Sequence, residues 1–153
     1  MTKFLLAVHV LAAIVAIGPV TIAASMFPPA ARRAIEAPDD VRAAETVQLL
    51  HRICRVYAVV GVVVPVFGFA TASNMHVLGS AWLITSIALT AVAALVLATL
   101  VLPRQSALVE VAGSGAGTRE ATVRLAMFTG VFNLLWAAVT VLMIVRPGST
   151  TGA

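Results

Sequence analysis

Three long stretches without a charged residue constrain the fold of this chain more than any other feature. They cover residues 4–31, 56–103 and 125–145 of the 153-residue sequence. A helix needs about 20 apolar residues to cross the roughly 30 Å of hydrocarbon in a bilayer. The middle stretch is long enough for two crossings, so the pattern predicts four transmembrane helices.

Prolines and small polar residues set the expected ends of these helices. We expect the first helix to stop before Pro28-Pro29 and the third before Pro103, because proline removes a helical hydrogen bond. The pair Ser73-Asn74 divides the middle stretch, since it offers a turn and then an N-cap. The predicted spans are residues 4–27, 57–72, 76–102 and 125–145, with segments 28–55 and 103–124 outside the membrane. A cleaved signal peptide is the alternative for the first span, but further spans follow and its apolar stretch exceeds the usual length of about 7–15 residues.

The composition agrees with a membrane protein. Hydrophobic residues make up 61% of the chain and charged residues 10%, against about 25% charged residues in soluble domains. These values exclude a soluble enzyme, a disulfide scaffold and a disordered chain, and Cys54 alone cannot form an internal disulfide. The sequence therefore predicts one all-α domain over residues 1–153, a four-helix transmembrane bundle surrounded by the lipid bilayer.

The positive charges are divided unevenly between the two sides of the predicted bundle. Eight of the ten Lys and Arg residues lie in segments 28–55 and 103–124, while Lys3 and Arg146 lie on the other side. Cytoplasmic loops carry the excess of positive charge in membrane proteins. We therefore expect both long segments in the cytoplasm and both termini outside, and we expect no nucleic-acid partner despite the net charge of +4. The preference for Arg over Lys is typical of GC-rich bacterial genomes, which predicts a bacterial plasma membrane.

The segment before the second span has the pattern of an amphipathic helix. From Asp40 to Arg55, charged residues recur every three or four positions on one face, while Val47 and Cys54 mark the other. Asp39 or Asp40 can cap this helix, which we expect to continue unbroken into the membrane. Its polar face could contact anionic lipid headgroups, a partner subunit or only solvent.

The other long segment contains the glycine-rich stretch GSGAG at residues 113–117. A phosphate-binding loop would need a preceding strand and a following Lys-Ser or Lys-Thr pair, and the sequence supplies neither. We therefore interpret this stretch as a flexible linker.

The two halves of the chain share a short internal repeat. His9 is followed by Val-Leu-Ala-Ala and His76 by Val-Leu-Gly-Ser, each near the expected start of a span. The sequences ETVQL from Glu45 and EATVRL from Glu120 are also alike and precede the second and fourth spans. These matches favour two tandem helical hairpins related by a pseudo-two-fold axis along the membrane normal. His9 and His76 would then be symmetry mates.

Histidines are the candidate functional residues, because ionisable groups inside a bilayer are costly and often functional. We expect His9 about 7–8 Å inside the outer edge of the first span and His76 in the first turn of the third span. Both lie on the outer side, so together they could bind haem b or a metal ion. The alternatives are a structural hydrogen bond for His9 with a solvated His76, and a proton or quinone role. His51 lies at the inner boundary, on the apolar side of its helix, and cannot join them.

Other polar and small residues predict contacts between helices. Asn133 in the fourth span is expected to form an interhelical hydrogen bond. Pro19 and Pro65 should kink the first and second helices. Gly61 and Gly68 form a small-residue stripe that would let another helix approach closely. The sequence has no paired carboxylates, Ser-His-Asp set or metal-binding motif, so no catalytic residue and no resident cofactor is expected.

The first span also carries a family resemblance. It reads FLLAVHVLAAI from residue 4, with Gly18 after it, and it resembles the opening of small bacterial integral membrane proteins of unknown function. That group is similar in layout to the membrane domain of copper-resistance D-type proteins and, more remotely, to four-helix b-type haem proteins. The haem-binding relatives carry histidines in several helices, whereas the second and fourth spans here have none within the membrane.

The function expected from the sequence is that of an accessory or scaffold subunit, which associates with itself or with a larger membrane complex. The alternative is a haem- or metal-binding electron carrier that uses His9 and His76. A third possibility is a protein that handles small solutes or lipids in a cavity near the proline kinks.

Overall fold

The computed structural model describes residues 1–112, 114 and 116–148 and is helical along most of its length. Its elements are α1 (Thr2–Glu36), α2 (Val41–Val60), α3 (Val63–Asn74), α4 (Ala81–Leu95), the π-helical turn η1 (Val96–Val101), α5 (Leu102–Val111) and α6 (Arg119–Val145). These described parts of the chain contain no strand. The all-α prediction is therefore confirmed.

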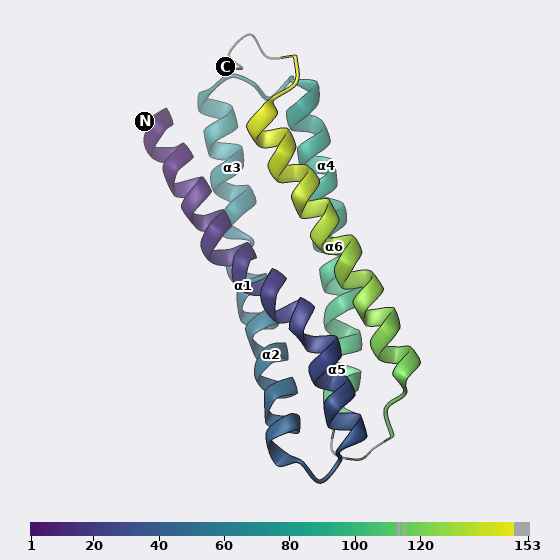
Figure 1. Ribbon diagram of the computed structural model, residues 1–153. Helices are drawn as coiled ribbons and strands as arrows, with labels where there is room; N and C mark the ends of the chain where they lie inside the picture. The colour runs from purple at the N-terminus through teal and green to yellow at the C-terminus, as the bar shows by residue number, and fades with distance from the viewer. Residues whose placement is uncertain (113, 115, 149–153) are drawn as a thin grey trace.

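The elements form four long rods, and each rod runs antiparallel to the one before it in the chain (Figure 1). α2 and α3 make up the second rod, and α4, η1 and α5 make up the third. The start of α1, the α3–α4 loop and the end of α6 lie at one end of the molecule, while the α1–α2 turn and the α5–α6 connection lie at the other. The rods contain 35, 34, 31 and 27 residues and are apolar enough to cross a membrane. The chain therefore has the architecture of a multi-pass membrane protein, as predicted.

The rods pack as two antiparallel hairpins. α1 contacts α2 and α3, and α6 contacts α4 and η1. The hairpins meet where α1 contacts α6 and where α2 contacts α5. This arrangement agrees with the two predicted hairpins, and the pseudo-two-fold axis between them stays a prediction.

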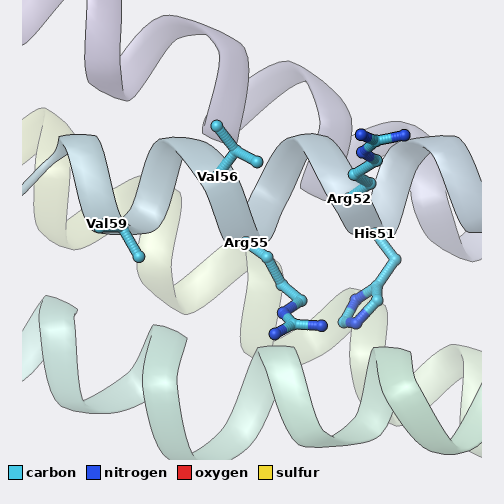
Figure 2. A pocket seen from close by; sticks show the side chains of 5 residues that line it. All are labelled: His51, Arg52, Arg55, Val56 and Val59. Atoms are coloured by element: carbon cyan, nitrogen blue, oxygen red, sulfur yellow. The ribbon is translucent and has the colours of Figure 1, made fainter.

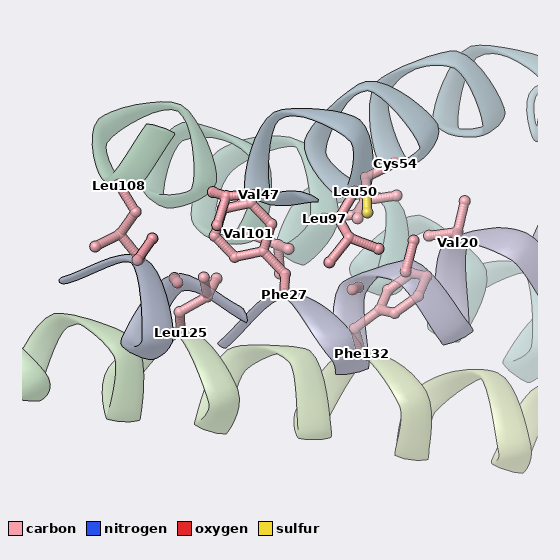
Figure 3. Close-up of a cluster of buried hydrophobic side chains, with 14 of the residues drawn as sticks. Val20, Phe27, Val47, Leu50, Cys54, Leu97, Val101, Leu108, Leu125 and Phe132 are labelled. Atoms are coloured by element: carbon pink, nitrogen blue, oxygen red, sulfur yellow. The ribbon is translucent and has the colours of Figure 1, made fainter. Parts of the chain in front are cut away.

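The main hydrophobic core lies in the half of the bundle that includes the α1–α2 turn. Its largest buried side chains come from all four rods (Figure 3) and include Phe27, Val47, Val101, Leu125 and Phe132. A smaller cluster near the opposite end joins Ala72 of α3 to Trp82 and Leu83 of α4. Most of the buried apolar contacts thus lie at the end of the molecule that carries the α1–α2 turn and the α5–α6 connection.

α1 is longer than predicted. The expected end at residue 27 is wrong, because α1 runs through Pro28 and Pro29 to Glu36. The two prolines remove helical hydrogen bonds, but the turns around them pack into the core, where Phe27 and Ala31 are almost fully buried. The helix therefore continues through both prolines where its surface packs against the rest of the bundle.

The second rod is interrupted one turn before Pro65. A proline ring clashes with the carbonyl group four residues earlier, which here belongs to Gly61. The chain forms a tight turn at Gly61 and Val62, in which the Val64 N–H donates to the Gly61 carbonyl oxygen at 3.1 Å. The disturbance predicted at Pro65 is therefore present as a break between α2 and α3. Pro19, by contrast, lies within the continuous helix α1.

The third rod passes Pro103, so its predicted end at residue 102 is also wrong. Residues Val96–Val101 form a π-helical turn just before the proline, and α5 then continues to Val111. The wider turn relieves the clash that the Pro103 ring would otherwise make with the carbonyl group of Thr99. The proline thus changes the form of the helix without ending it.

The third rod also starts later than predicted. α4 begins at Ala81 with Ser80 at its N-cap, so the expected start at His76 is wrong. Asn74, which we expected to cap this helix, belongs to the end of α3 instead, and its Nδ2 donates to the Ala70 carbonyl oxygen at 3.0 Å. His76 lies in the loop between the two helices with a φ of 57°. His9 and His76 therefore do not occupy equivalent positions in the two hairpins.

The amphipathic segment before the second span is helical from Val41, as predicted. Asp40 is its cap, and its Oδ1 accepts hydrogen bonds from the backbone N–H groups of Arg42 and Ala43 at 3.0 and 3.3 Å.

The glycine-rich stretch predicted as a linker is described only in part, because residues 113 and 115 lie outside the described residues. Gly117 lies against α1: a Cβ atom there would be 2.6 Å from Ile35 Cδ1. This end of the connection is thus packed against the bundle.

Candidate functional site

His9 lies on the face of α1 that packs against α3. Its Nδ1 donates a hydrogen bond to the Val64 carbonyl oxygen at 2.9 Å. Because a carbonyl oxygen can only accept, the proton is on Nδ1 and Nε2 is left as an acceptor. Ala16, two turns further along the same face, is buried. His9 therefore points into the bundle, as predicted from the small residues around it.

Gly68 is the position at which α3 comes closest to His9. A Cβ atom at Gly68 would be 2.8 Å from the His9 Cε1 atom, so the absence of a side chain makes room for the imidazole. At Gly61, the nearest atoms to such a Cβ are the carbonyl groups of Tyr57 and Ala58 in the preceding turn. Of the two predicted close-approach positions, Gly68 has this role toward another helix, and Gly61 belongs to the break before Pro65.

His76 is not brought together with His9. The His9 imidazole lies beside Val64 and Gly68, whereas His76 follows the end of α3 and is exposed. The six residues from Gly68 to Asn74 alone rise about 9 Å along the helix. Within the described residues, no group of three or more His, Cys, Asp or Glu side chains is placed to hold a metal ion. The structure therefore does not assemble the predicted two-histidine site.

His51 lies in a buried polar network between α2 and α5. Its Nδ1 donates to Gln105 Oε1 at 3.1 Å, and its Nε2 accepts from the Ser106 hydroxyl at 3.2 Å. The Gln105 Nε2 group donates to Cys54 Sγ at 3.5 Å, and Gln105 is fully buried. The Phe27 ring packs edge-on against the imidazole, with ring centroids 6.5 Å apart. A neutral imidazole satisfies these bonds, so the network holds α2 to α5 inside an apolar core.

A shallow pocket of about 290 Å³ lies next to this network. It is lined by His51, Arg52, Arg55, Val56 and Val59. His51 and Arg55 project from one side of α2 toward α5, whereas Arg52 projects from the other side (Figure 2). Both ring nitrogens of His51 already have partners in the network. The imidazole is thus occupied by structural bonds, and Arg55 is the basic group that this side of the pocket presents.

Asn133 forms the interhelical hydrogen bond that we predicted. Its Nδ2 donates to Ser25 Oγ on α1 at 3.0 Å, at an exposed place where α1 and α6 meet. The Ser25 hydroxyl in turn donates to the Thr21 carbonyl oxygen in its own helix at 2.7 Å. Thr140 makes no such contact between helices, because its hydroxyl donates to the Trp136 carbonyl oxygen of α6. Asn133 therefore joins α6 to α1, whereas Thr140 bonds within its own helix and the buried Thr129 hydroxyl has no hydrogen-bond partner among the described residues.

A second pocket, of about 590 Å³, lies between α5 and the start of α6; we call it the α5–α6 pocket. It is lined by Arg104, Ala107, Leu108, Val111, Ala116, Gly117, Thr118, Glu120, Ala121 and Arg124. Arg104 and Arg124 thus bring two positive charges to one cavity, and Glu120 brings one negative charge. None of these residues was a candidate in the sequence.

Neither the role of Gln105 nor the α5–α6 pocket was predicted from the sequence. Both depend on α5. The predicted end of the third helix at residue 102 places the residues of α5 in a loop, where no such contacts are expected. One available signal was position: Arg104 directly follows one uncharged stretch and Arg124 directly precedes another. The predicted spans therefore place the two residues at the same membrane boundary.

These sites offer hydrogen bonding and positive charge, whereas the predicted histidine pair is not assembled. The resemblance to small bacterial membrane proteins and to copper-resistance D-type proteins stays a prediction. Comparison of the chain with protein-family models, with curated proteins and with solved structures finds no match.

Proposed function

We propose that this chain is an accessory or scaffold membrane protein that associates with a second copy of itself. The proposed contact is the lipid-facing seam between α1 and α6, which consists of Gly18 and Ser25 on α1 and of Gly130 and Asn133 on α6. The observation that carries the proposal is the exposed hydrogen bond from Asn133 to Ser25 within this seam.

The chemistry of the seam differs from that of an ordinary lipid-facing surface. Amide and hydroxyl groups are costly in hydrocarbon, and helix contacts in membranes gain from burying them. Ser25 is exposed and Asn133 is half-buried, so the pair borders the lipid in a single copy. A second bundle laid over the seam would remove this pair from lipid.

The shape of the seam also suits another helix. No atom lies within 4 Å of a Cβ placed at Gly18 or at Gly130, so both positions are open. On α6, Ala126 and Ala137 lie four residues before and seven residues after Gly130 and therefore share its face. Small residues with this spacing allow the backbones of two helices to approach closely.

Self-association can be measured by energy transfer between donor- and acceptor-labelled copies in liposomes. We expect transfer in the wild-type protein and a clear loss in Gly130→Leu, because the added side chain fills the open position. Ala94→Leu is the matched control, since it enlarges an exposed small residue on a different rod. A wild-type protein without transfer, or equal transfer in both variants, would contradict the proposal.

Binding of haem or a metal ion is the second candidate, and one observation favours it. The Nδ1 of His9 donates to a backbone carbonyl group, which is the usual way in which a protein orients an imidazole that ligates a metal through Nε2. An absorbance spectrum of the purified protein tests this candidate. A Soret band that is present in the wild type and lost in His9→Asn would favour the electron carrier over the scaffold.

A further inference from the structure

The geometry points to the α5–α6 pocket as a binding site for the headgroup of an anionic phospholipid. This inference is independent of the proposed self-association, because the pocket lies on different residues from the α1–α6 seam.

The two arginines of the pocket lie at the boundary of the membrane. Arg104 is the first charged residue after the uncharged stretch 56–103, and Arg124 is the last one before the stretch 125–145. Both therefore lie at the depth of lipid headgroups, where basic pockets between transmembrane helices bind acidic lipids.

Arg104 is held in place before any ligand binds. Its guanidinium carbon lies 4.4 Å from the centroid of the Phe128 ring, and its Nη1 donates to the Leu100 carbonyl oxygen at 3.0 Å. These contacts use one face and one N–H group of the guanidinium, which has five N–H donors in total. The remaining donors of a fixed guanidinium suit the oxygen atoms of a phosphate group.

Within the described residues, the ion-pair partner of Arg124 is Glu120. Its Nη2 lies 2.7 Å from Glu120 Oε1, and these side chains are 65% and 72% exposed. An exposed ion pair of this kind contributes little, typically below about 1 kcal/mol. A phosphate group can therefore compete with Glu120 for Arg124, while Glu120 limits the affinity of the empty pocket for anions.

The remaining walls of the pocket favour a lipid over a soluble phosphate. Ala107, Leu108, Val111 and Ala121 give the cavity an apolar lining next to its charged groups. An anionic phospholipid brings both a phosphate in its headgroup and the start of its acyl chains, so it matches both kinds of surface. The first turn of α6, whose N–H groups carry partial positive charge, also lines the pocket.

The test is the binding of a short-chain phosphatidylglycerol to the purified full-length protein, measured by native mass spectrometry. We expect Arg104→Gln and Arg124→Gln to weaken binding about fivefold each, the share of one basic residue near a membrane surface. Glu120→Gln should strengthen binding, because it removes the competing carboxylate. Because the Glu120 side chain is exposed, Glu120→Gln should not affect folding. This variant therefore tests the pocket even if Arg104→Gln reduces folding.

Arg146→Gln is the matched control. Arg146 also lies near an aromatic ring, 5.7 Å from the centroid of Trp82, and donates to the Met143 carbonyl oxygen, but at the opposite end of the bundle. This variant should bind phosphatidylglycerol as the wild type does, and phosphatidylcholine should bind more weakly than phosphatidylglycerol to all variants that keep both pocket arginines. Equal losses in Arg146→Gln and Arg104→Gln, unchanged binding in Arg124→Gln and Glu120→Gln, or inorganic phosphate displacing the lipid at equal concentration would each overturn the inference.

Discussion

His9 shows how a single polar side chain is accommodated inside an apolar helix pair. Its Nδ1 donates to the Val64 carbonyl oxygen, and the neighbouring Gly68 leaves space for its ring. We expect His9→Asn to keep most of the stability, because the Asn amide nitrogen occupies a position close to that of Nδ1. His9→Leu should lower the free energy of unfolding by about 1 kcal/mol, the size of an interhelical hydrogen bond in a membrane. Thermal unfolding in detergent, followed by circular dichroism, measures both.

Gln is the other amide that can replace His9. Gln places its amide nitrogen near the position of Nε2, so the structure predicts that Gln preserves less stability than Asn. Equal unfolding temperatures for the Asn and Leu variants would show that the bond to Val64 contributes nothing.

Gly68 is coupled to His9 by direct contact. Gly68→Ala should destabilise the protein, because the new Cβ atom would lie 2.8 Å from the imidazole. In Gly79→Ala, in the α3–α4 loop, the new atom meets nothing within 4 Å, so this control should be neutral. In the His9→Ala background, Gly68→Ala should lose its cost. A cost that is the same in both backgrounds would rule out the contact as its cause.

The inward direction of His9 was predictable from the small residues on its face, but its partner was not. The partner is a backbone carbonyl group on a helix 55 residues away in sequence, and every residue carries such a group. The expected partner, His76, lies in a loop instead. A sequence pattern identifies which side of a helix is buried, whereas it does not identify the main-chain atom that a side chain meets.

At the scale of elements, the contact between α2 and α5 depends on His51 and Gln105. Gln105→Leu should lower the free energy of unfolding by about 1–3 kcal/mol, because it leaves the buried Nδ1–H of His51 without an acceptor. The double variant His51→Leu with Gln105→Leu should recover much of this loss, since replacing both partners by apolar groups removes the unpaired donor. Chemical denaturation in mixed micelles measures the three proteins, and a double variant less stable than Gln105→Leu would contradict this account of the network.

The elements themselves were only partly predictable, and the prolines explain why. Each proline has the same local effect in a helix: it removes a hydrogen bond and clashes with an earlier carbonyl group. The structure shows different outcomes: α1 passes Pro28 within the core, the third rod passes Pro103 through a π-helical turn, and the second rod breaks before Pro65. Packing against neighbouring rods decides among these outcomes, and that packing depends on residues distant in sequence. The site elements that we missed, α5 above all, follow from this difference.

At the scale of the whole molecule, the number of rods was predictable because it depends on the length of uncharged sequence. A bilayer requires about 20 apolar residues per crossing, and the structure contains four helical rods that are long and apolar enough. The distribution of charge predicts the orientation, through the eight Lys and Arg residues on one side against two on the other. The structure places the α1–α2 turn and the α5–α6 connection together at one end, opposite the α3–α4 loop (Figure 1). The two ends can therefore be tested separately.

We expect the end with the eight basic residues to face the cytoplasm, because positively charged loops are retained there. Single cysteines can be placed at Ala37 and Ser114 for this end and at Ser73 for the other, all exposed positions. The background is Cys54→Ser, which removes the native buried thiol. A membrane-impermeant thiol reagent added to intact cells should label the cysteine at position 73 and leave those at 37 and 114 unlabelled, and permeabilised cells should show labelling at all three. Labelling at 37 and 114 but not at 73 in intact cells would reverse the orientation, and it would place the pocket formed by Arg104 and Arg124 in the outer leaflet.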